Sequence, residues 1–176
     1  MAGQGGQGLI LAGLVLAEAL ALHDGKNVVM SQSYGAEQRG GLSRSEVIVS
    51  DGEIDFPKVI EADLLLVLTQ EAYDRFSGKV KKEGLVVVDP SLVLRADQPH
   101  TLAFPLTESL KKGGLSTVTL SIAALGLISR LTGLVTPEAL HRALVDRAPA
   151  GTAETNWKAV EVGMGMATED SLAVFK

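Results

Sequence analysis

The stretch from Glu61 to Pro90, EADLLLVLTQEAYDRFSGKVKKEGLVVVDP, decides the fold class. Asp63–Leu68 is a continuous apolar run of strand length, and Leu85–Val88 is a second one. Between them, Gln70–Glu83 has the apolar spacing of an amphipathic helix. Strands that are apolar on both faces and alternate with helices indicate a parallel sheet that is covered by helices on both sides.

The same alternation continues in both directions along the chain. Leu9–Leu22 is apolar on nearly all faces and predicts a helix that is buried on more than one side. Further strands are predicted at residues 27–31, 46–50 and 100–104, with a glycine-rich, charged loop at 34–45. Helices are predicted at 116–131, from Thr136 with Pro137 at the first position, and at 154–168. We therefore expect a single α/β domain: an open, mostly parallel, Rossmann-like sheet covered by helices over about residues 1–106, and a helical C-terminal layer over about 107–176.

Composition excludes several classes of function. The 176 residues include 16 basic and 21 acidic side chains and no cysteine. The acidic balance argues against nucleic acid as a partner, because a phosphate-binding surface needs basic residues. The missing cysteines exclude disulfides, iron–sulfur ligation and thiol catalysis within this chain. His23, His100 and His141 are scattered without the spacing of metal ligands, so no metal site is expected. No apolar stretch reaches the ~20 residues that cross a membrane, and we expect a cytoplasmic protein.

The first motif that carries chemistry is glycine-rich. Gly3-Gln4-Gly5-Gly6-Gln7-Gly8 satisfies the G-x-G-x-x-G pattern and leads directly into the predicted helix at Leu9. Such a loop lets the backbone approach a phosphate and directs the free N–H groups of the helix start at it. The dinucleotide-binding version also needs a preceding strand and an acidic residue after the second strand. The second strand leads into Gln32-Ser33-Tyr34, and with the chain beginning at Met1 the first strand is expected to be missing.

This pattern favours a phosphate-bearing ligand other than a dinucleotide. Two alternatives stay open: a purely structural glycine turn, and a free-standing Rossmann-like oxidoreductase that binds a dinucleotide. A second loop, Tyr34-Gly35-Ala36-Glu37-Gln38-Arg39-Gly40-Gly41, follows a strand, where open α/β sheets place their ligands. Arg39 suits a bidentate contact with phosphate or carboxylate. An ordinary surface turn with a solvated arginine is the other interpretation.

Taken together, these motifs resemble the gamma subunit of the 2-oxoacid:ferredoxin oxidoreductases. The resemblance rests on the glycine loop, on Ser31–Gly41 (SQSYGAEQRGG), on Ser43–Val47, on Glu61–Ala72 (EADLLLVLTQEA) and on Thr155–Ala159 (TNWKA). It covers most of the chain in order. The YGAEQRGG segment favours members of the family that act on 2-oxoglutarate over those that act on pyruvate.

The resemblance implies a subunit without redox chemistry of its own. The family converts a 2-oxoacid, coenzyme A and oxidised ferredoxin into acyl-CoA, carbon dioxide and reduced ferredoxin, using thiamine diphosphate and [4Fe–4S] clusters. These cofactors would lie on alpha and beta subunits, with a delta, ferredoxin-like subunit as a further candidate partner, while the gamma chain binds coenzyme A and is inactive alone. No catalytic residue is expected in this chain. The residues expected at coenzyme A are Gly3, Gly5, Gly6, Gln7, Gly8, Tyr34, Arg39, Gly40 and Gly41.

One further expectation concerns the surface of the helical layer. Trp157, Met164 and Met166 are apolar side chains near the C-terminus. Packing against a partner subunit and packing into the chain's own core are equally compatible with their positions.

Overall fold

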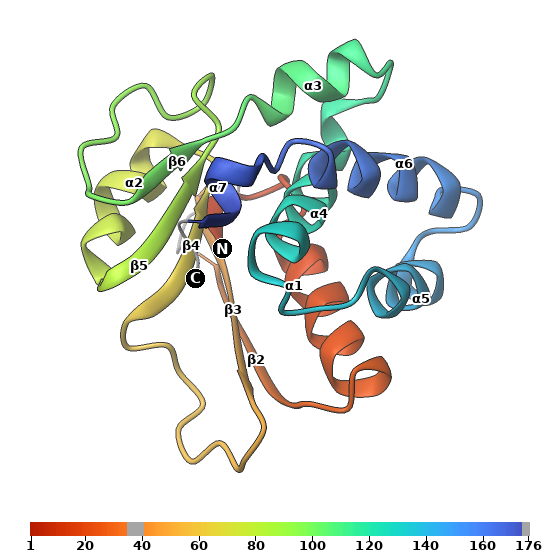
Figure 1. Ribbon diagram of the computed structural model, residues 1–176, viewed down its shortest axis with the longest axis horizontal. Helices are drawn as coiled ribbons and strands as arrows, with labels where there is room; N and C mark the ends of the chain where they lie inside the picture. The colour runs from red at the N-terminus through yellow and green to blue at the C-terminus, as the bar shows by residue number, and fades with distance from the viewer. Residues whose placement is uncertain (35–40, 174–176) are drawn as a thin grey trace.

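The computed structural model describes residues 1–34 and 41–173 and confirms the α/β prediction. Within these residues, six strands form one sheet in the order β2-β3-β1-β4-β5-β6 (Figure 1). β4 is parallel to β1 and β5, and β6 is parallel to β5, whereas β3 is antiparallel to both of its neighbours. The strands are β1 (Ala2–Gln4), β2 (Asn27–Tyr34), β3 (Leu42–Ser50), β4 (Ala62–Val67), β5 (Val80–Val88) and β6 (Thr101–Ala103).

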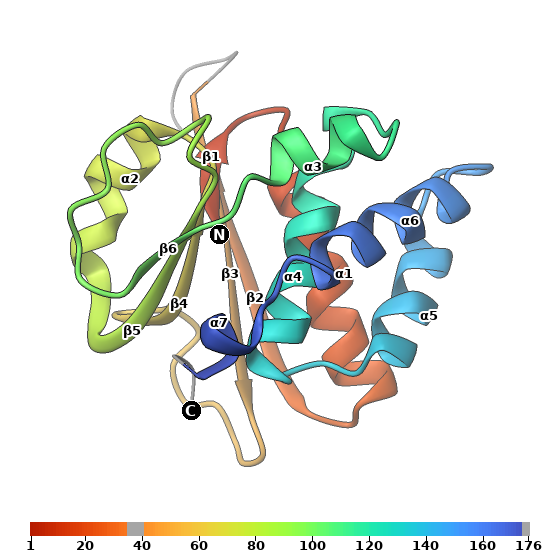
Figure 2. The ribbon, with the colours of Figure 1, turned by 45° about the horizontal axis from the view of Figure 1, so that its top comes forward.

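Helices cover both faces of the sheet. Of the helices in the described residues, α2 covers one face, while α1, α4, α5 and α6 form a thick layer against the other (Figure 2). The helices are α1 (Leu9–Glu18), α2 (Gln70–Phe76), α3 (Leu106–Lys112), α4 (Leu120–Thr132), α5 (Pro137–Arg147), α6 (Ala153–Met164) and α7 (Glu169–Ala173). A π-helical turn at Ala19–His23 extends α1, and a 3-10 turn at Thr117–Thr119 precedes α4. No helix in the described part of the chain has the length and apolar character needed to cross a membrane.

The apolar runs at the centre of the sheet are buried on both faces, as predicted. Leu66 of β4 and Val87 of β5 point into the large core beneath α1 and α4. Their neighbours Leu65 and Val86 point the other way, into a smaller core that contains Tyr73 of α2. Because successive side chains in a strand alternate between faces, only a continuous apolar run can supply both cores.

The prediction that the first strand is missing is wrong. Ala2–Gln4 forms β1, which pairs with β3 on one side and with β4 on the other. The glycine motif thus begins inside a strand, since Gly3 pairs with Ser43. Three residues, one of which is glycine, are too few to give a strand pattern in the sequence.

The β2–β3 edge of the sheet also departs from the prediction. β2 and β3 form an antiparallel hairpin. β3 begins at Leu42, so the last four residues of the loop predicted at 34–45 belong to a strand. Residues 35–41 are too few for the crossover of a dozen or more residues that a parallel pair requires. The alternation of small polar and charged side chains at Ser43–Glu46 hid the start of β3, because this stretch has no apolar run.

The predicted helix at 70–83 is also too long. α2 ends at Phe76, and β5 begins at Val80. Lys81, which falls within the predicted helix, lies in β5, where its Nζ is 2.7 Å from Asp63 Oδ1 of β4. A strand whose first residues are charged and exposed resembles the polar side of a helix in sequence.

Two glycines in the helical layer allow α4 and α6 to pack with their backbones in contact. A Cβ on Gly126 would collide with the Val160 backbone, and one on Gly163 would collide with the Ala123 carbonyl oxygen. Part of the glycine content of this chain therefore serves helix packing, in addition to the two loops that the sequence singled out.

Candidate functional site

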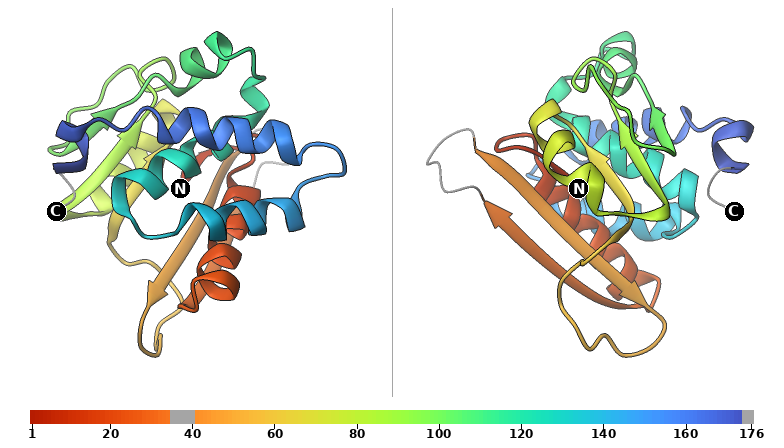
Figure 3. Two further views of the ribbon diagram at one scale, coloured as in Figure 1. Left: turned by 45° about the vertical axis from the view of Figure 1, so that its right-hand side comes forward. Right: turned by 90° about the vertical axis from the view of Figure 1, so that its left-hand side faces the viewer.

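The site expected from the sequence lies where the path of the chain through the sheet reverses. From β1 the chain passes through α1 to β2 on one side, whereas from β4 it passes through α2 to β5 on the other. The two crossover helices lie on opposite faces (Figure 3). Open α/β sheets bind ligands outside the carboxyl ends of their strands at such a switch point, here the boundary between β1 and β4.

The glycine loop occupies this position. Gly6 has φ 94° and Gly8 has φ 76°, in the left-handed region that side chains disfavour. Gly8 is also the N-cap of α1, and its position supplies no side chain to cap the helix. The N–H groups of the first turn of α1 therefore face the loop without a side-chain acceptor, which is the arrangement that binds anions such as phosphate.

Gln7 holds the loop in place. Its Oε1 accepts a hydrogen bond of 2.7 Å from Gln4 N–H, and its Nε2 donates one of 3.0 Å to the Leu68 carbonyl at the end of β4. A Cβ on Gly3 would collide with Gln7 Oε1. Gly3 thus makes room for this side chain from within β1. Gln7 positions the loop through its side chain and through its N–H, which donates to the Gln4 carbonyl at 3.2 Å.

The structure brings the start of β3 to the glycine loop. Gly5 N–H donates a hydrogen bond of 3.0 Å to the Gly41 carbonyl, so the end of the second predicted loop is joined to the first. Tyr34 ends β2, one strand further out, and pairs with Ser43 of β3. Its side chain is 66% exposed. Arg39 and Gly40 lie outside the described residues.

One part of the site was not predicted. The N-terminus of α4 packs directly on the glycine loop, because a Cβ on Gly8 would lie 2.7 Å from the buried Ser121 Oγ. Ser116 caps the preceding turn, where its Oγ accepts from Val118 N–H at 3.3 Å. The Ser and Thr residues at 116–121 were the signal in the sequence, since such residues cap helix starts.

The acidic residue at the adjacent strand end has a structural role. Asp89 follows β5 and is fully buried. Its Oδ1 accepts hydrogen bonds from Ser91 N–H and Oγ at 2.9 and 2.7 Å, and its Oδ2 accepts one from Thr107 N–H at 2.7 Å. With these partners, the carboxylate ties the end of β5 to the start of α3 instead of facing a ligand.

The remaining candidates from the sequence lie away from this site. His23 Nε2 is 4.0 Å from Asp146 Oδ2, and the rings of His141 and Trp157 lie nearly perpendicular with their centroids 4.6 Å apart. Among the described residues, no group of three His, Asp or Glu side chains is placed to hold a metal ion. Trp157, Met164 and Met166 are partly buried and pack against the large core, which favours the core interpretation.

Known proteins resemble this chain over nearly its whole length. The family model for pyruvate ferredoxin/flavodoxin oxidoreductase matches residues 1–166. 2-Oxoglutarate synthase subunit KorC from Methanocaldococcus jannaschii is 42% identical over 173 residues, which covers 96% of this chain and 92% of that protein.

Two solved structures are also similar. The gamma subunit of a keto/oxoacid ferredoxin oxidoreductase from Geobacter sulfurreducens is 43% identical with a TM-score of 0.83, over 94% of this chain and 95% of that one. The 2-oxoglutarate:ferredoxin oxidoreductase from Magnetococcus marinus, with 2-oxoglutarate, coenzyme A and succinyl-CoA bound, is 25% identical with a TM-score of 0.83, over 94% of this chain and 30% of that one. The chain therefore belongs to the pyruvate ferredoxin/flavodoxin oxidoreductase family and corresponds to its gamma subunit.

Proposed function

We propose that this chain binds coenzyme A within a multi-subunit 2-oxoacid:ferredoxin oxidoreductase and is inactive by itself. The observation that carries the proposal is the uncapped N-terminus of α1 behind the glycine loop, at the switch point of the sheet. The relative from Magnetococcus marinus, whose structure holds coenzyme A and succinyl-CoA, supports the same ligand.

The proposed contacts are electrostatic. Backbone N–H groups of Gly6, Gly8 and the first turn of α1 would hold the diphosphate of coenzyme A. The N–H of Gln7 already donates to the Gln4 carbonyl at 3.2 Å, so Gln7 would contribute by fixing the loop against β4 through its side chain. Gly41 closes the other side through its bond to Gly5. Arg39, with Gly40, would add a charge-assisted contact to a phosphate group, and the exposed Tyr34 would border the site.

The oxidative chemistry would belong to other chains. Thiamine diphosphate, when bound on partner subunits, supplies the carbanion that is needed for decarboxylation. Electrons would leave through [4Fe–4S] clusters, which need thiolate ligands that this cysteine-free chain does not have. Alpha and beta subunits, and a delta subunit that resembles ferredoxin, are the proposed partners, with ferredoxin as the acceptor. The names of the KorC relatives favour 2-oxoglutarate as the oxoacid.

The alternative of a free-standing dinucleotide-binding oxidoreductase is not favoured. β1 does precede the glycine loop, as that function requires, but β2 ends in Ser33-Tyr34 without an acidic residue. The carboxylate of Asp89, after β5, is already engaged by Ser91 and Thr107. No described acidic group at the end of β2 is thus placed for a ribose diol.

Reconstitution tests the proposal. The chain would be combined with alpha, beta and delta subunits of its own complex, and reduction of a viologen dye by 2-oxoglutarate would be followed with and without coenzyme A. We expect coenzyme A-dependent turnover only with this chain present. Calorimetry on the assembled complex should detect binding of coenzyme A and no binding of NADH. Turnover by the isolated chain, or equal coenzyme A binding by a complex that lacks it, would overturn the proposal.

A further inference from the structure

The connection between β5 and β6 is unusual for a pair of parallel strands. Residues 89–100, all of which lie in the described part of the chain, join the two strands without a helix, although a helix is the usual crossover. Because β1, β4 and β5 run in the same direction, this connection leaves β5 at the edge of the sheet where the glycine loop lies. It then passes over α2 (Figure 2). Its backbone depends on side chains for hydrogen-bond partners.

Gln70, the first residue of α2, fixes this connection near its middle. Its Oε1 accepts hydrogen bonds from the N–H groups of Leu94 at 2.9 Å and Arg95 at 3.0 Å, and its Nε2 donates one of 3.0 Å to the Arg95 carbonyl. Further along, Tyr73 Oη accepts a hydrogen bond of 2.8 Å from Gln98 N–H. The backbone of Leu94 and Arg95 is therefore held at the start of α2.

This attachment lies beside the candidate coenzyme site. Gln70 follows Leu68 by two residues, and the Leu68 carbonyl accepts the hydrogen bond from Gln7 that fixes the glycine loop. β1 and β4 are neighbours in the sheet, and neighbouring strands lie about 5 Å apart. The glycine loop therefore borders the switch point from the side of α1, while Leu94 and Arg95 border it from the side of α2.

The two side chains on this fixed backbone differ in chemistry. Leu94 is apolar and 81% exposed, and Arg95 is a cation that is exposed as well. Within residues 1–34 and 41–173, the Arg95 guanidinium takes part in no ion pair. Two carboxylates of this region, those of Asp74 and Asp97, accept hydrogen bonds from side chains of α2 instead. Arg95 thus combines a fixed backbone with a guanidinium that is available to an anion.

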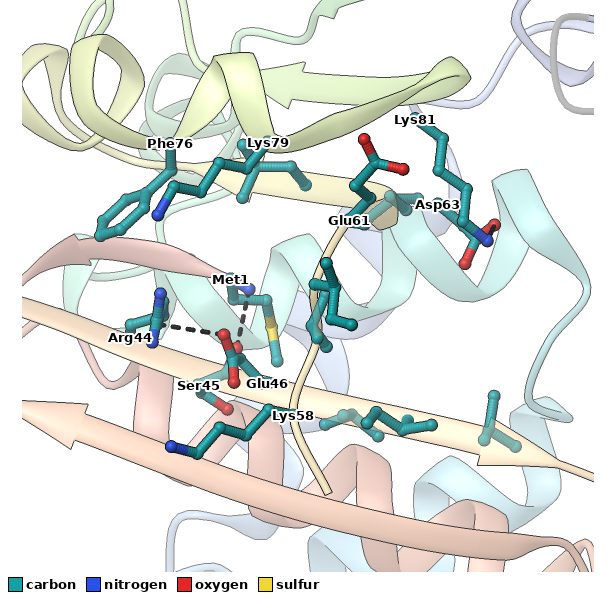
Figure 4. A pocket seen from close by; sticks show the side chains of 18 of the residues that line it. Met1, Arg44, Ser45, Glu46, Lys58, Glu61, Asp63, Phe76, Lys79 and Lys81 are labelled. Atoms are coloured by element: carbon teal, nitrogen blue, oxygen red, sulfur yellow. Dashed lines mark hydrogen bonds and ion pairs between the residues drawn. The ribbon is translucent and has the colours of Figure 1, made fainter. Parts of the chain in front are cut away.

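The arginines at the opposite edge of the sheet have partners. A cavity of about 860 Å³ opens at that edge between β3 and β4, beside Met1 (Figure 4). On its wall, Arg44 Nε is 3.2 Å from Glu46 Oε1. The guanidinium carbons of Arg44 and of Arg75, in the last turn of α2, lie 5.2 and 5.7 Å from the Phe76 ring centroid. Both arginines therefore have contacts of a kind that the described residues do not offer Arg95.

We propose that Leu94 and Arg95 form a subsite for the 3′-phosphoadenosine end of coenzyme A, an inference that rests on the proposed function. With the diphosphate at the glycine loop, the adenosine and its separate 3′-phosphate extend across the switch point towards α2. The Arg95 guanidinium pairs with this phosphate monoester, since its planar set of N–H donors suits phosphate oxygens. The Leu94 side chain packs against the adenine base. Gln70 is a positioning residue, because it holds the backbone of both.

The test compares coenzyme A with 3′-dephospho-coenzyme A, which lacks only the 3′-phosphate. Calorimetry on the assembled complex gives Kd for each ligand. We expect the unmodified complex to bind coenzyme A at least about tenfold more tightly, as one charge-assisted hydrogen bond would provide. Arg95→Ala should remove this preference by weakening coenzyme A alone, and Arg95→Glu should reverse it. Arg75→Ala, at the other end of α2, is the matched control and should leave both Kd values unchanged.

Two further variants separate the base from the phosphate. Leu94→Ser should raise Kd by the same factor for both ligands, because adenine is present in each. Gln70→Ala should weaken both ligands and also reduce the preference for coenzyme A, since it releases the backbone of Leu94 and Arg95. A purely structural role of Gln70 would lower stability without changing the ratio of the two Kd values.

A preference for coenzyme A that survives Arg95→Ala would overturn the inference, and its loss in Arg39→Ala instead would assign the 3′-phosphate to the second predicted loop. Equal Kd values of the unmodified complex for the two ligands would also overturn it, because no group of the protein would then bind that phosphate. Coenzyme A still binds in each of these cases, so the proposed function would stand. Failure of the unmodified complex to bind coenzyme A would contradict the proposed function itself.

Discussion

The two ends of β1 lie in very different surroundings. At its C-terminal end the chain turns through Gly5–Gly8, and hydrogen bonds tie this loop to Gly41 of the second loop and to Leu68 after β4. At its N-terminal end β3 and β4 diverge around a cavity, and Met1 makes the last rung. Among the described residues, the same three-residue strand thus ends in a hydrogen-bonded turn on one side and between two diverging strands on the other.

Because of this difference, the contacts that fix the glycine loop are separate from those at the amino end of the sheet. The glycine loop is fixed by contacts with β3 and β4 that do not involve the cavity. Changes at the amino end should therefore alter stability with little effect on the loop, whereas changes in the loop should alter ligand affinity at a modest cost in stability.

The largest effect is expected at the amino end and depends on pH. The pKa of the buried Met1 amino group is about 6, against an ordinary value of 8.0. Between these values the unfolded chain binds more protons, so the free energy of unfolding should rise with pH across this window, by up to about 2–3 kcal/mol from this group. Urea unfolding at pH 5.5 and 8.5 measures it, after mass spectrometry has verified that Met1 is retained.

The control for this prediction is the same chain with an acetylated amino terminus. It keeps an N–H for the Ser45 carbonyl but carries no charge, so its stability should lack this component of the pH dependence. Identical pH profiles of the free and acetylated chains would contradict the burial of the amino group.

In the second predicted loop, on the glycine-loop side of β1, Arg39→Ala should weaken coenzyme A binding by about 1–3 kcal/mol, which corresponds to about 5- to 150-fold in Kd. The expected loss is that of one charge-assisted hydrogen bond. Calorimetry on the assembled complex measures the affinity. Arg142→Ala, on the exposed side of α5, is the matched control and should leave it unchanged. Equal Kd values for both variants would remove Arg39 from the proposed site.

Gln7→Ala should lower the free energy of unfolding by about 1–2 kcal/mol, because it removes two hydrogen bonds and leaves the Leu68 carbonyl without its side-chain donor. The loop should lose its fixed position as well, so Kd for coenzyme A should rise. Urea denaturation and calorimetry are the two measurements. Unchanged affinity with lowered stability would show that Gln7 stabilises only the sheet.

The smallest and sharpest comparison uses two glycines with positive φ. Gly6 in the loop (φ 94°) and Gly25 before β2 (φ 69°) both have no other group within 4 Å of an added Cβ. Alanine at either position should cost about 1 kcal/mol of stability through backbone strain alone. Only Gly6→Ala should also weaken coenzyme A binding. Equal affinity of the two variants for coenzyme A would show that Gly6 has only a structural role in the turn.

The sequence predicts the centre of the fold well because burial there leaves a strong pattern. β4 and β5 are apolar on both faces, and Pro137 at the start of α5 follows the known preference of helix N-termini. β1 and the start of β3 were missed for the opposite reason. Ala2–Gln4 and Ser43–Glu46 owe their strand conformation to pairing with each other and with distant strands, which no local pattern records.

The candidate site was predicted in part. Glycines with positive φ and a helix start at a switch point follow from the motif and its position. The side-chain role of Gln7 and the contact of Ser121 with Gly8 could not be predicted, because they depend on Leu68 and on α4, which lie 61 residues and more than 100 residues away in the chain.

The glycine contact between α4 and α6 has a mechanical consequence. α4 meets the glycine loop at Ser121, and five residues later Gly126 packs against the Val160 backbone of α6. Two helices whose backbones touch leave little room for sliding. We therefore expect α4 and α6 to move together, so that a protein bound to the outer surface of α6 would act on the glycine loop through the contact of Ser121 with Gly8.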